Sequence, residues 1–176
     1  YGDYLRTGCI ASKSRIINDV LKHANKGGLV LGICNGFQIL IETGLLPGVL
    51  LRNKKLRFIS KSVFLKVVNV NSKFCLNYNR KNIIKLPIAH NEGNFFANNE
   101  LLQKLEDRNL VAFKYCNEKG DINKTSNPNG SSNNIAGILN NEKNILGMMP
   151  HPERLIDPLL SGEDGSMMFE SLFQSH

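Results

Sequence analysis

A short, wholly apolar segment at residues 29–33 lies between two segments whose apolar residues recur at helical spacing. The preceding helix is expected over residues 11–26, because the pair Gly27-Gly28 favours a helix C-terminus. The following helix is expected over residues 36–43. A strand that is apolar on both faces is typical of a parallel sheet covered by helices on both sides. The sequence therefore predicts an α/β fold with a mostly parallel sheet.

The remaining segments extend this α/β pattern to the end of the chain. The stretch over 121–134 is polar and rich in Asn, Ser and Gly, and its length indicates a functional loop. No internal repeat or linker interrupts the pattern, so we expect one domain over residues 1–176. The other expected elements are strands at 58–70, 86–90 and 110–116, helices at 98–107 and 165–173, and an antiparallel hairpin of strands 135–139 and 145–149.

The net charge of +7 over 176 residues raises the possibility of nucleic-acid binding. The cations are scattered rather than arranged in a stripe, and Lys54, Lys55 and Arg57 form the densest group. A solvated basic face or an acidic partner protein explains this distribution better, so no nucleic-acid partner is expected. No apolar run approaches the roughly 20 residues of a membrane helix, and no signal peptide precedes the first residues, which favours a cytoplasmic protein without a membrane partner.

The four cysteines do not have the spacing of a metal site. They form no CxxC pair and no close Cys/His cluster, so we expect neither a metal nor a bound cofactor in this chain. Free thiols in a reducing cytosol are the expected state. The four are Cys9, Cys34, Cys75 and Cys116.

The sequence Gly-Ile-Cys-Asn-Gly at residues 32–36 places a nucleophile between an expected strand and an expected helix. This is the setting of a nucleophile elbow, in which Cys34 has a positive φ and the flanking glycines let strand and helix pack closely. The helix N-terminus lowers the pKa of such a thiol, and the backbone N–H of Asn35 would face a developing oxyanion. A buried cysteine in an ordinary strand–helix turn is the competing interpretation.

A second motif, Met-Pro-His-Pro-Glu at residues 149–153, follows the last expected strand. The prolines favour an extended backbone, which would point His151 and Glu153 the same way. A carboxylate in that place can hold the tautomer of an imidazole that accepts and returns a proton. A surface loop is the alternative for this motif alone, but together with the elbow it completes a Cys/His/Glu triad.

Two stretches resemble the signatures of class I (triad) glutamine amidotransferases: Leu-Gly-Ile-Cys-Asn-Gly-Phe-Gln at 31–38 and Gly-Met-Met-Pro-His-Pro-Glu-Arg at 147–154. Further stretches, spread in order along the chain, are similar to one branch, the glutaminase subunits of phosphoribosylformylglycinamidine synthase in purine biosynthesis. The resemblance implies a flavodoxin-like sheet flanked by helices and the hydrolysis of glutamine to glutamate and ammonia. The further stretches lie at 1–6, 44–48, 88–93, 127–131, 134–137 and 162–165.

The resemblance implies a role for each matched residue. Cys34 attacks the glutamine side-chain amide, His151 relays protons and Glu153 orients His151, while Asn35 supplies an oxyanion donor. His90 and Glu92 are either a second catalytic dyad or part of a polar loop near the partner, and Asn91 stands where the family pattern has Gly. The positions implied to bind the substrate are Gln38, Asn129, Gly130 and Ser131.

The resemblance also implies partners. A large synthetase subunit would use ATP, Mg²⁺ and formylglycinamide ribonucleotide, and a small bridging subunit would join the complex. The family's first strands and their Pro-Gly-Gly turn, which gives the second oxyanion donor, are absent before residue 1, so we expect an N-terminally truncated chain with weak or no activity. The alternatives are a glutaminase subunit of another amidotransferase and a non-catalytic module that docks a partner.

Overall fold

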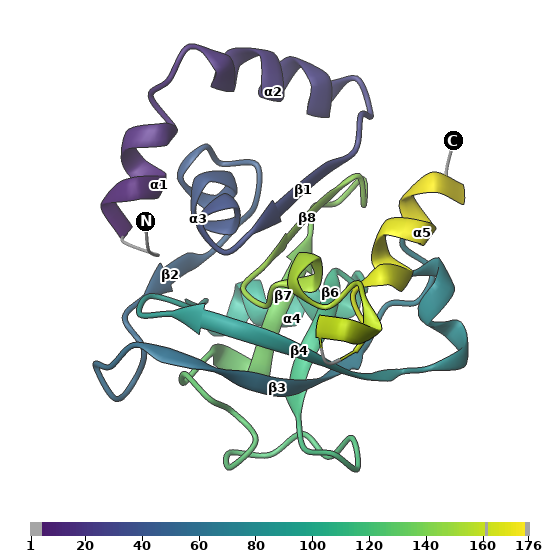
Figure 1. Ribbon diagram of the computed structural model, residues 1–176. Helices are drawn as coiled ribbons and strands as arrows, with labels where there is room; N and C mark the ends of the chain where they lie inside the picture. The colour runs from purple at the N-terminus through teal and green to yellow at the C-terminus, as the bar shows by residue number, and fades with distance from the viewer. Residues whose placement is uncertain (1–4, 161, 175–176) are drawn as a thin grey trace.

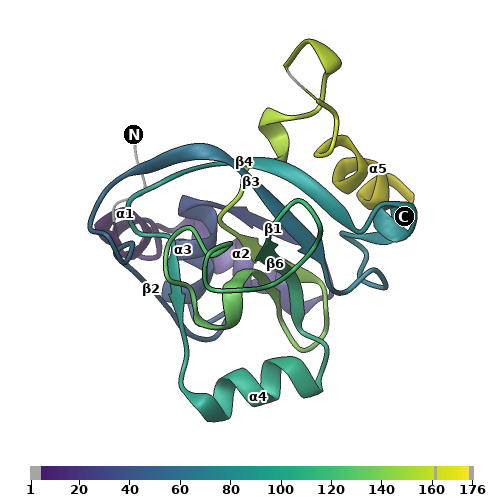
Figure 2. The ribbon, with the colours of Figure 1, turned by 90° about the horizontal axis from the view of Figure 1, so that it is seen from below.

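The computed structural model describes residues 5–160 and 162–174, and in these residues helices flank a curled, mixed β-sheet (Figure 1). The expected α/β class is confirmed. Helices α1 to α3 gather at one end of the sheet, and α5 lies near the other end. Figure 2 shows that α4 lies on the side of the molecule opposite α5. The stretch at 1–6 that supported the resemblance falls largely outside the described residues.

The elements follow the expected order along the chain. The helices are α1 (Leu5–Ala11), α2 (Ile16–Asn25), α3 (Asn35–Glu42), α4 (Asn99–Asp107) and α5 (Ser166–Gln174), with short 3₁₀ turns η1 (Leu76–Arg80), η2 (Ser132–Asn134), η3 (Pro152–Arg154) and η4 (Pro158–Leu160). The strands are β1 (Val30–Ile33), β2 (Val49–Leu51), β3 (Ile59–Val67), β4 (Ile83–His90), β5 (Asn94–Phe96), β6 (Val111–Cys116), β7 (Ile135–Leu139) and β8 (Ile145–Met148).

The main sheet has the order β1-β8-β7-β6-β3-β4, and β2 pairs with β5 in a separate ribbon. Only β1 and β8 run parallel, and every other pairing among the described strands is antiparallel. The expectation of a mostly parallel sheet therefore holds for the β1–β8 pair and is wrong for the other described strands. The reason is visible for β7 and β8, because a tight turn such as the one at 140–144 can join only antiparallel neighbours.

Strand β1 lies at an edge of the described sheet and is only partly covered. Helix α3 packs on β1 and β8, and α1 packs on α3 from outside. Of the β1 residues only Gly32 is buried, which differs from the expectation of a strand enclosed on both faces. Within the described residues β1 has helix packing on one side and strand pairing on one edge.

The helix expected over residues 11–26 is shorter than predicted, and a separate helix that was not expected precedes it. The hydroxyl of Ser12 donates to the carbonyl of Cys9 at 2.7 Å, a local bond that competes with helix continuation. Helix α1 therefore ends at Ala11, and α2 begins at Ile16. Asn144 ties the end of α2 to the sheet, because its buried amide donates to the carbonyls of Ala24 and Gly28.

The inner face of β3 carries the expected alternation. Val63, Leu65 and Val67 are buried, whereas Ile59 is only half-buried. Aromatic side chains fill much of the core, and the rings of Phe37 and Phe95 stack with their centroids 6.0 Å apart. This contact joins α3, which carries the elbow, to the β5 ribbon. The largest fully buried side chains include Tyr78, Tyr115, Phe37, Phe74, Phe95 and Phe113.

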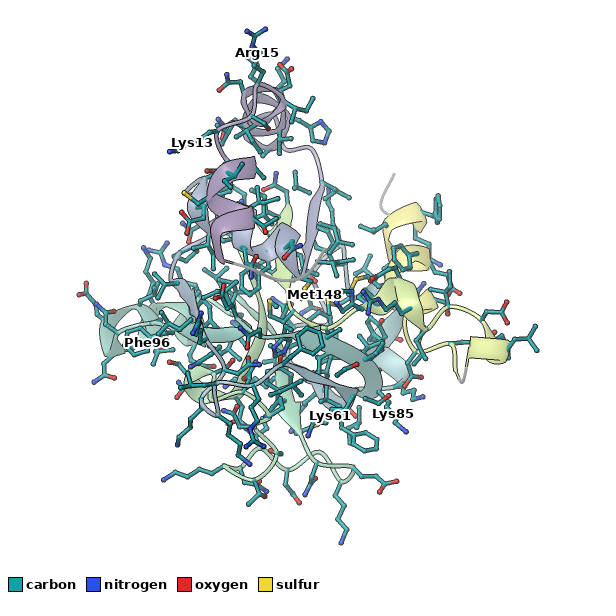
Figure 3. All side chains as sticks on the ribbon, turned by 60° about the vertical axis from the view of Figure 1, so that its left-hand side comes forward. Lys13, Arg15, Lys61, Lys85, Phe96 and Met148 are labelled. Atoms are coloured by element: carbon teal, nitrogen blue, oxygen red, sulfur yellow. The ribbon has the colours of Figure 1, made fainter. Side chains whose placement is uncertain are left out.

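The cations are spread over the surface, as Figure 3 shows for four of them. Lys13 and Arg15 project at the α1–α2 end, whereas Lys61 and Lys85 lie at the opposite end of the molecule, far from that pair. The densest group, Lys54, Lys55 and Arg57, is exposed in the loop after β2. All four cysteines are free thiols, and only Cys9 among them is exposed.

None of the described helices has the length and apolar character needed to cross a membrane. Within residues 5–160 and 162–174, no group of three or more His, Cys, Asp or Glu side chains is arranged to hold a metal ion.

Candidate active site

Cys34 sits at the junction of β1 and α3 in a strained backbone conformation. Its φ is 53° and its ψ is −106°, and it occupies the N-cap position of α3. A positive φ at a non-glycine residue costs free energy and persists only where the surroundings impose it. Here the Cys34 N–H donates to the carbonyl of Met148 at 2.8 Å, which extends the β1–β8 pairing by one residue. The predicted elbow is confirmed.

The two glycines of the elbow differ in how closely they are packed. A β-carbon on Gly32 would lie 2.8 Å from the backbone carbonyl carbon and oxygen of Gly36 and 2.4 Å from Cδ1 of Leu40. A β-carbon on Gly36 would meet no atom within 4 Å. The close packing of strand and helix therefore requires Gly32 alone, and the expectation that both positions need glycine is wrong for Gly36.

His151 and Glu153 follow β8 and are joined by a hydrogen bond. Nδ1 of His151 lies 2.6 Å from Oε1 of Glu153, and the imidazole is buried. The His151 N–H donates to the carbonyl of Pro87 at 2.9 Å, which fixes this segment against β4. Glu153 lies in the 3₁₀ turn η3 rather than in an extended segment, so the expected pairing forms through a different backbone conformation. Pro152 starts that turn, since its ring presets the required φ.

Partial burial by itself would raise the pKa of the Glu153 carboxyl. The hydrogen bond and the charge of His151 act in the opposite direction, Arg154 adds to them, and the resulting pKa is lower than usual. A carboxylate in this place stabilises the proton on Nδ1 of His151. Nε2 of His151 is then the ring atom that can exchange protons, and it is buried without a hydrogen-bond partner in the described structure.

The nucleophile and the imidazole are brought to one place by the parallel pair of strands. Ile33 is opposite Met148 in the register of β1 and β8, so Cys34 and the segment leading to His151 leave the same edge of the sheet. Both also meet β4, because Sγ of Cys34 lies 3.9 Å from the carbonyl oxygen of Ala89. The parallel pair thus places Cys34 and the His151–Glu153 pair after neighbouring strand ends, and a nucleophilic role for the three side chains stays a prediction.

Gln38 lies one helical turn after Cys34, and its side chain is buried. Its backbone N–H donates to the carbonyl of Cys34 at 3.3 Å, while neither polar atom of its side-chain amide has a partner in the described structure. A buried amide with unused hydrogen-bonding capacity is rare and is typical of a binding site. Its contact with substrate, like the oxyanion role of the adjacent Asn35, stays a prediction.

The loop residues expected to bind substrate form hydrogen bonds within the protein. The Asn129 amide donates to the carbonyl of Gly93 at 2.7 Å, and the Ser131 hydroxyl accepts from the N–H of Phe95 at 3.1 Å. Gly130 adopts a φ of 93°, which favours glycine, and is exposed between them. These contacts hold the β4–β5 turn in place, and substrate binding by the three residues stays a prediction.

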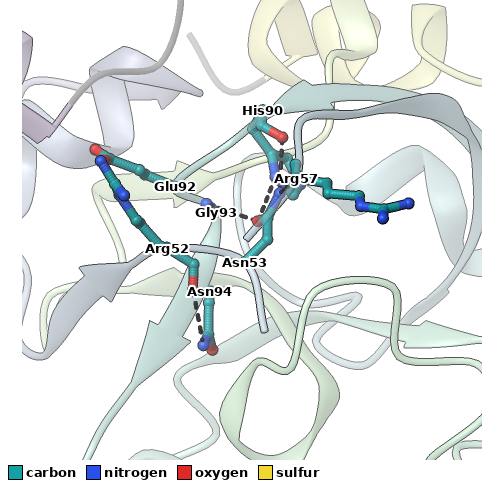
Figure 4. A network of polar contacts seen from close by, with 7 residues as sticks. All are labelled: Arg52, Asn53, Arg57, His90, Glu92, Gly93 and Asn94. Atoms are coloured by element: carbon teal, nitrogen blue, oxygen red, sulfur yellow. Dashed lines mark hydrogen bonds and ion pairs between the residues drawn. The ribbon is translucent and has the colours of Figure 1, made fainter. Parts of the chain in front are cut away.

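His90 and Glu92 do not form a dyad (Figure 4). Nδ1 of His90 lies 3.0 Å from Oδ1 of Asn53, whereas Oε1 of Glu92 lies 3.5 Å from Nε of Arg52. Neither ring nitrogen of His90 contacts Glu92, because Nδ1 faces Asn53 and Nε2 has no hydrogen-bond partner in the described residues. Of the two interpretations, the structure favours a polar turn in which each residue contacts the loop after β2.

Sequence reasoning missed two residues close to this cluster. Asn53 is fully buried and contacts His90, and Tyr115 is fully buried with its hydroxyl 3.4 Å from the amide nitrogen of Asn129. Burial raises the pKa of Tyr115, and the nearby charge of Cys34 adds to the effect. Neither residue lies in a recognisable motif, because each is brought to the site by tertiary contacts alone.

Burial lowers the pKa of His90 from 6.5 to about 4, and the charge of His151 contributes to the effect. The folded protein thus holds His90 neutral at a pH where the unfolded chain binds a proton. Because the unfolded state binds more protons between these two pKa values, stability is lost as the pH falls through this window.

We expect His90 alone to reduce the free energy of unfolding by about 2 kcal/mol between near pH 7 and near pH 5. Urea titrations of the parent and of His90→Gln at both pH values measure the effect. The variant is expected to lose correspondingly less stability on acidification, because other groups such as Glu153 titrate equally in both proteins. An equal loss in the two proteins would contradict the assignment.

Comparison with known proteins identifies the family to which this chain belongs. The model of the CobB/CobQ-like glutamine amidotransferase domain matches residues 2–164. The chain is 57% identical to the phosphoribosylformylglycinamidine synthase subunit PurQ of Pelagibacter ubique over 99% of its own length and 77% of that relative. It is 51% identical to the PurQ subunit of Gloeobacter violaceus, over 99% and 75% of the two chains.

The chain belongs to the PurQ branch of the glutamine amidotransferase family. A solved structure of PurLQS from Thermotoga maritima agrees, with a TM-score of 0.84 and 39% sequence identity over 99% of this chain and 74% of that one. The resemblance carried by residues 31–38 and 147–154 is therefore confirmed at the level of the family and its fold. In this amidotransferase the two signatures become the elbow and the His151–Glu153 pair described above.

Proposed function

We propose that this chain is the glutamine-hydrolysing subunit of a phosphoribosylformylglycinamidine synthase. The observation that carries the proposal is that the Cys34 elbow and the hydrogen-bonded His151–Glu153 pair follow two neighbouring parallel strands at the same edge of the sheet. The relatives are named as subunits of phosphoribosylformylglycinamidine synthase, which supports the choice of this synthase.

In the proposed reaction Cys34 is the nucleophile, and His151 accepts and returns the proton in each step. Nε2 of His151 takes the thiol proton, and Sγ attacks the carboxamide carbon of glutamine to form a tetrahedral intermediate. The N–H of Asn35 receives the oxyanion, and protonated His151 delivers its proton to the leaving nitrogen, so that ammonia departs and a glutamyl thioester remains. His151 then takes a proton from water, whose oxygen attacks the thioester and releases glutamate and the thiol.

The remaining site residues are proposed to hold the substrate. Glu153 keeps His151 in the tautomer with a proton on Nδ1 and stabilises the imidazolium that forms in each half of the reaction. The unused amide of Gln38 suits a polar group of glutamine, and the loop carrying Asn129, Gly130 and Ser131 would help hold its amino-acid end.

We further propose that the ammonia is used by a large synthetase subunit that binds ATP, Mg²⁺ and formylglycinamide ribonucleotide, with a small bridging subunit in the complex. The name PurLQS of the Thermotoga maritima structure supports an assembly of this kind. The proposed hydrolysis needs no cofactor in this chain, because thiol, base and carboxylate are all side chains. Four free thiols support a cytoplasmic location.

Covalent trapping with 6-diazo-5-oxo-norleucine, a glutamine-like electrophile, tests the proposal. Peptide mass mapping is expected to find the label on Cys34, with labelling blocked by excess glutamine and lost in His151→Ala. Burial raises the pKa of Cys75 to about 12, so that thiol is an internal control that is expected to remain unlabelled. Equal labelling of Cys34 and the exposed Cys9, unaffected by glutamine, would contradict a glutaminase site.

A further inference from the structure

His90 is a second buried imidazole beside the candidate triad, and Asn53 fixes its orientation (Figure 4). Nδ2 of Asn53 donates to the carbonyls of His90 and Arg57, both at 2.8 Å. These two bonds settle which end of the amide is nitrogen, because carbonyl oxygens only accept. Oδ1 of Asn53 therefore faces Nδ1 of His90 at 3.0 Å and the N–H of Gly93 at 3.2 Å.

The tautomer of His90 follows from this arrangement. Because Oδ1 of Asn53 can only accept, Nδ1 of His90 must carry the proton and donate it. The neutral ring then has a bare lone pair on Nε2. Burial favours this neutral form, and so does the positive charge that His151 takes up when protonated.

No hydrogen-bond donor faces the lone pair on Nε2 in the described structure. His90 is fully buried, and Nε2 has no hydrogen-bond partner there. A buried acceptor without a donor costs free energy, so its retention calls for an explanation such as a ligand that supplies the donor.

The position of His90 associates this lone pair with the site. His90 ends β4, directly after Ala89, whose carbonyl oxygen lies 3.9 Å from Sγ of Cys34. The same strand accepts the backbone N–H of His151 through Pro87. The two buried imidazoles each have an Nε2 without a partner in the described structure, and the charge of His151 acts on His90.

We propose that Nε2 of His90 accepts a hydrogen bond from an N–H of bound glutamine or an O–H of the water that hydrolyses the thioester. Asn53 is the positioning residue that holds the ring for this contact. The proposal rests on the proposed glutaminase function and adds to it a contact on the side of β4.

Two substitutions distinguish a contact through Nε2 from a purely structural role for His90. In His90→Asn, the amide nitrogen can replace Nδ1 as donor to Asn53, but no atom reaches the place of Nε2. In His90→Gln, the longer side chain can place its oxygen near Nε2, but it loses the geometry of the Asn53 bond. If the ring served only to anchor the turn, His90→Asn would be the milder change.

The test is steady-state glutaminase kinetics of both variants in the complex with the synthetase subunit, after thermal unfolding shows that each variant is folded. We expect His90→Asn to lose about tenfold to a hundredfold in kcat/KM and His90→Gln to retain more activity. If the lost contact is to glutamine, KM rises. If it is to the hydrolytic water, kcat falls and the glutamyl thioester accumulates on Cys34. Acid quenching followed by mass spectrometry detects this thioester. Parent kinetics in His90→Asn, or lower activity in His90→Gln than in His90→Asn, would overturn the proposal.

Asn53→Asp provides a second route if either histidine variant fails to fold. Its carboxylate still accepts from Nδ1 but favours the doubly protonated ring, which has no lone pair on Nε2. Because the carboxylate cannot donate to the carbonyls of His90 and Arg57, thermal unfolding must first show that this variant is folded as well. The kinetic parameter that changes in His90→Asn is expected to change in the same direction here, and parent values would again overturn the proposal. Trapping of Cys34 in the unsubstituted protein tests the glutaminase proposal by itself. If Cys34 is trapped there and the variants keep parent kinetics, only the proposed contact of His90 fails.

Discussion

Cys34→Ser is expected to reduce glutamine hydrolysis by at least about 10⁴-fold while leaving the fold intact. Serine is close in size, so the elbow and its bond to the carbonyl of Met148 are preserved. The hydroxyl, however, is far less acidic than a thiol and is a poor nucleophile for an amide carbon. Glutamate release in the assembled complex measures the loss, and synthesis supported by added ammonium salt is expected to continue.

The matched control is Cys9→Ser, which makes the same chemical change at an exposed thiol in α1. Parent activity is expected there. The assignment of the nucleophile fails if Cys34→Ser still hydrolyses glutamine at the parent rate, because the reaction then does not need the Cys34 thiol. Loss of the ammonia-supported reaction as well would point instead to damage at the contact with the synthetase.

Gly32→Ala is expected to destabilise the fold by about 2–3 kcal/mol and to abolish glutamine hydrolysis. The added methyl group would lie 2.8 Å from the backbone of Gly36 and 2.4 Å from Leu40, so α3 must move away from β1. That movement displaces Cys34, which lies between the two elements. Thermal unfolding followed by circular dichroism measures the first effect, and the trapping reaction at Cys34 measures the second.

Gly36→Ala is the control within the same motif. A methyl group there meets no atom within 4 Å, and alanine is the better helix former, so stability is expected to stay equal or to rise by up to about 1 kcal/mol. Since both glycines flank the nucleophile, a motif-based view treats them alike, whereas the packing separates them. Equal destabilisation by the two substitutions would refute the steric account.

The sequence predicted those parts of the site that depend on local chain geometry. The positive φ of Cys34 follows from a strand and a helix meeting around one residue, and the His151–Glu153 bond joins residues two positions apart. Both signals are short-range, and their order along the chain matches the family. The hairpin of β7 and β8 was predictable for the same reason, since a polar turn separates two apolar strands.

The sequence did not predict contacts between distant segments. Asn53 lies in a basic, exposed loop, and nothing in its neighbourhood indicates that its own side chain is fully buried against His90. Tyr115 reads as one more aromatic residue of a buried strand.

The parallel pairing of β1 with β8 has a consequence for the timing of synthesis. β1 leaves the ribosome well before β8 and the histidine that follows it. Until the late strand docks, the nascent chain has a thiol but no base beside it and no second strand to impose the strained backbone. A polypeptide that ends before β8 is therefore expected to be inert toward the cell's glutamine pool, which would limit wasteful release of ammonia to chains translated through β8.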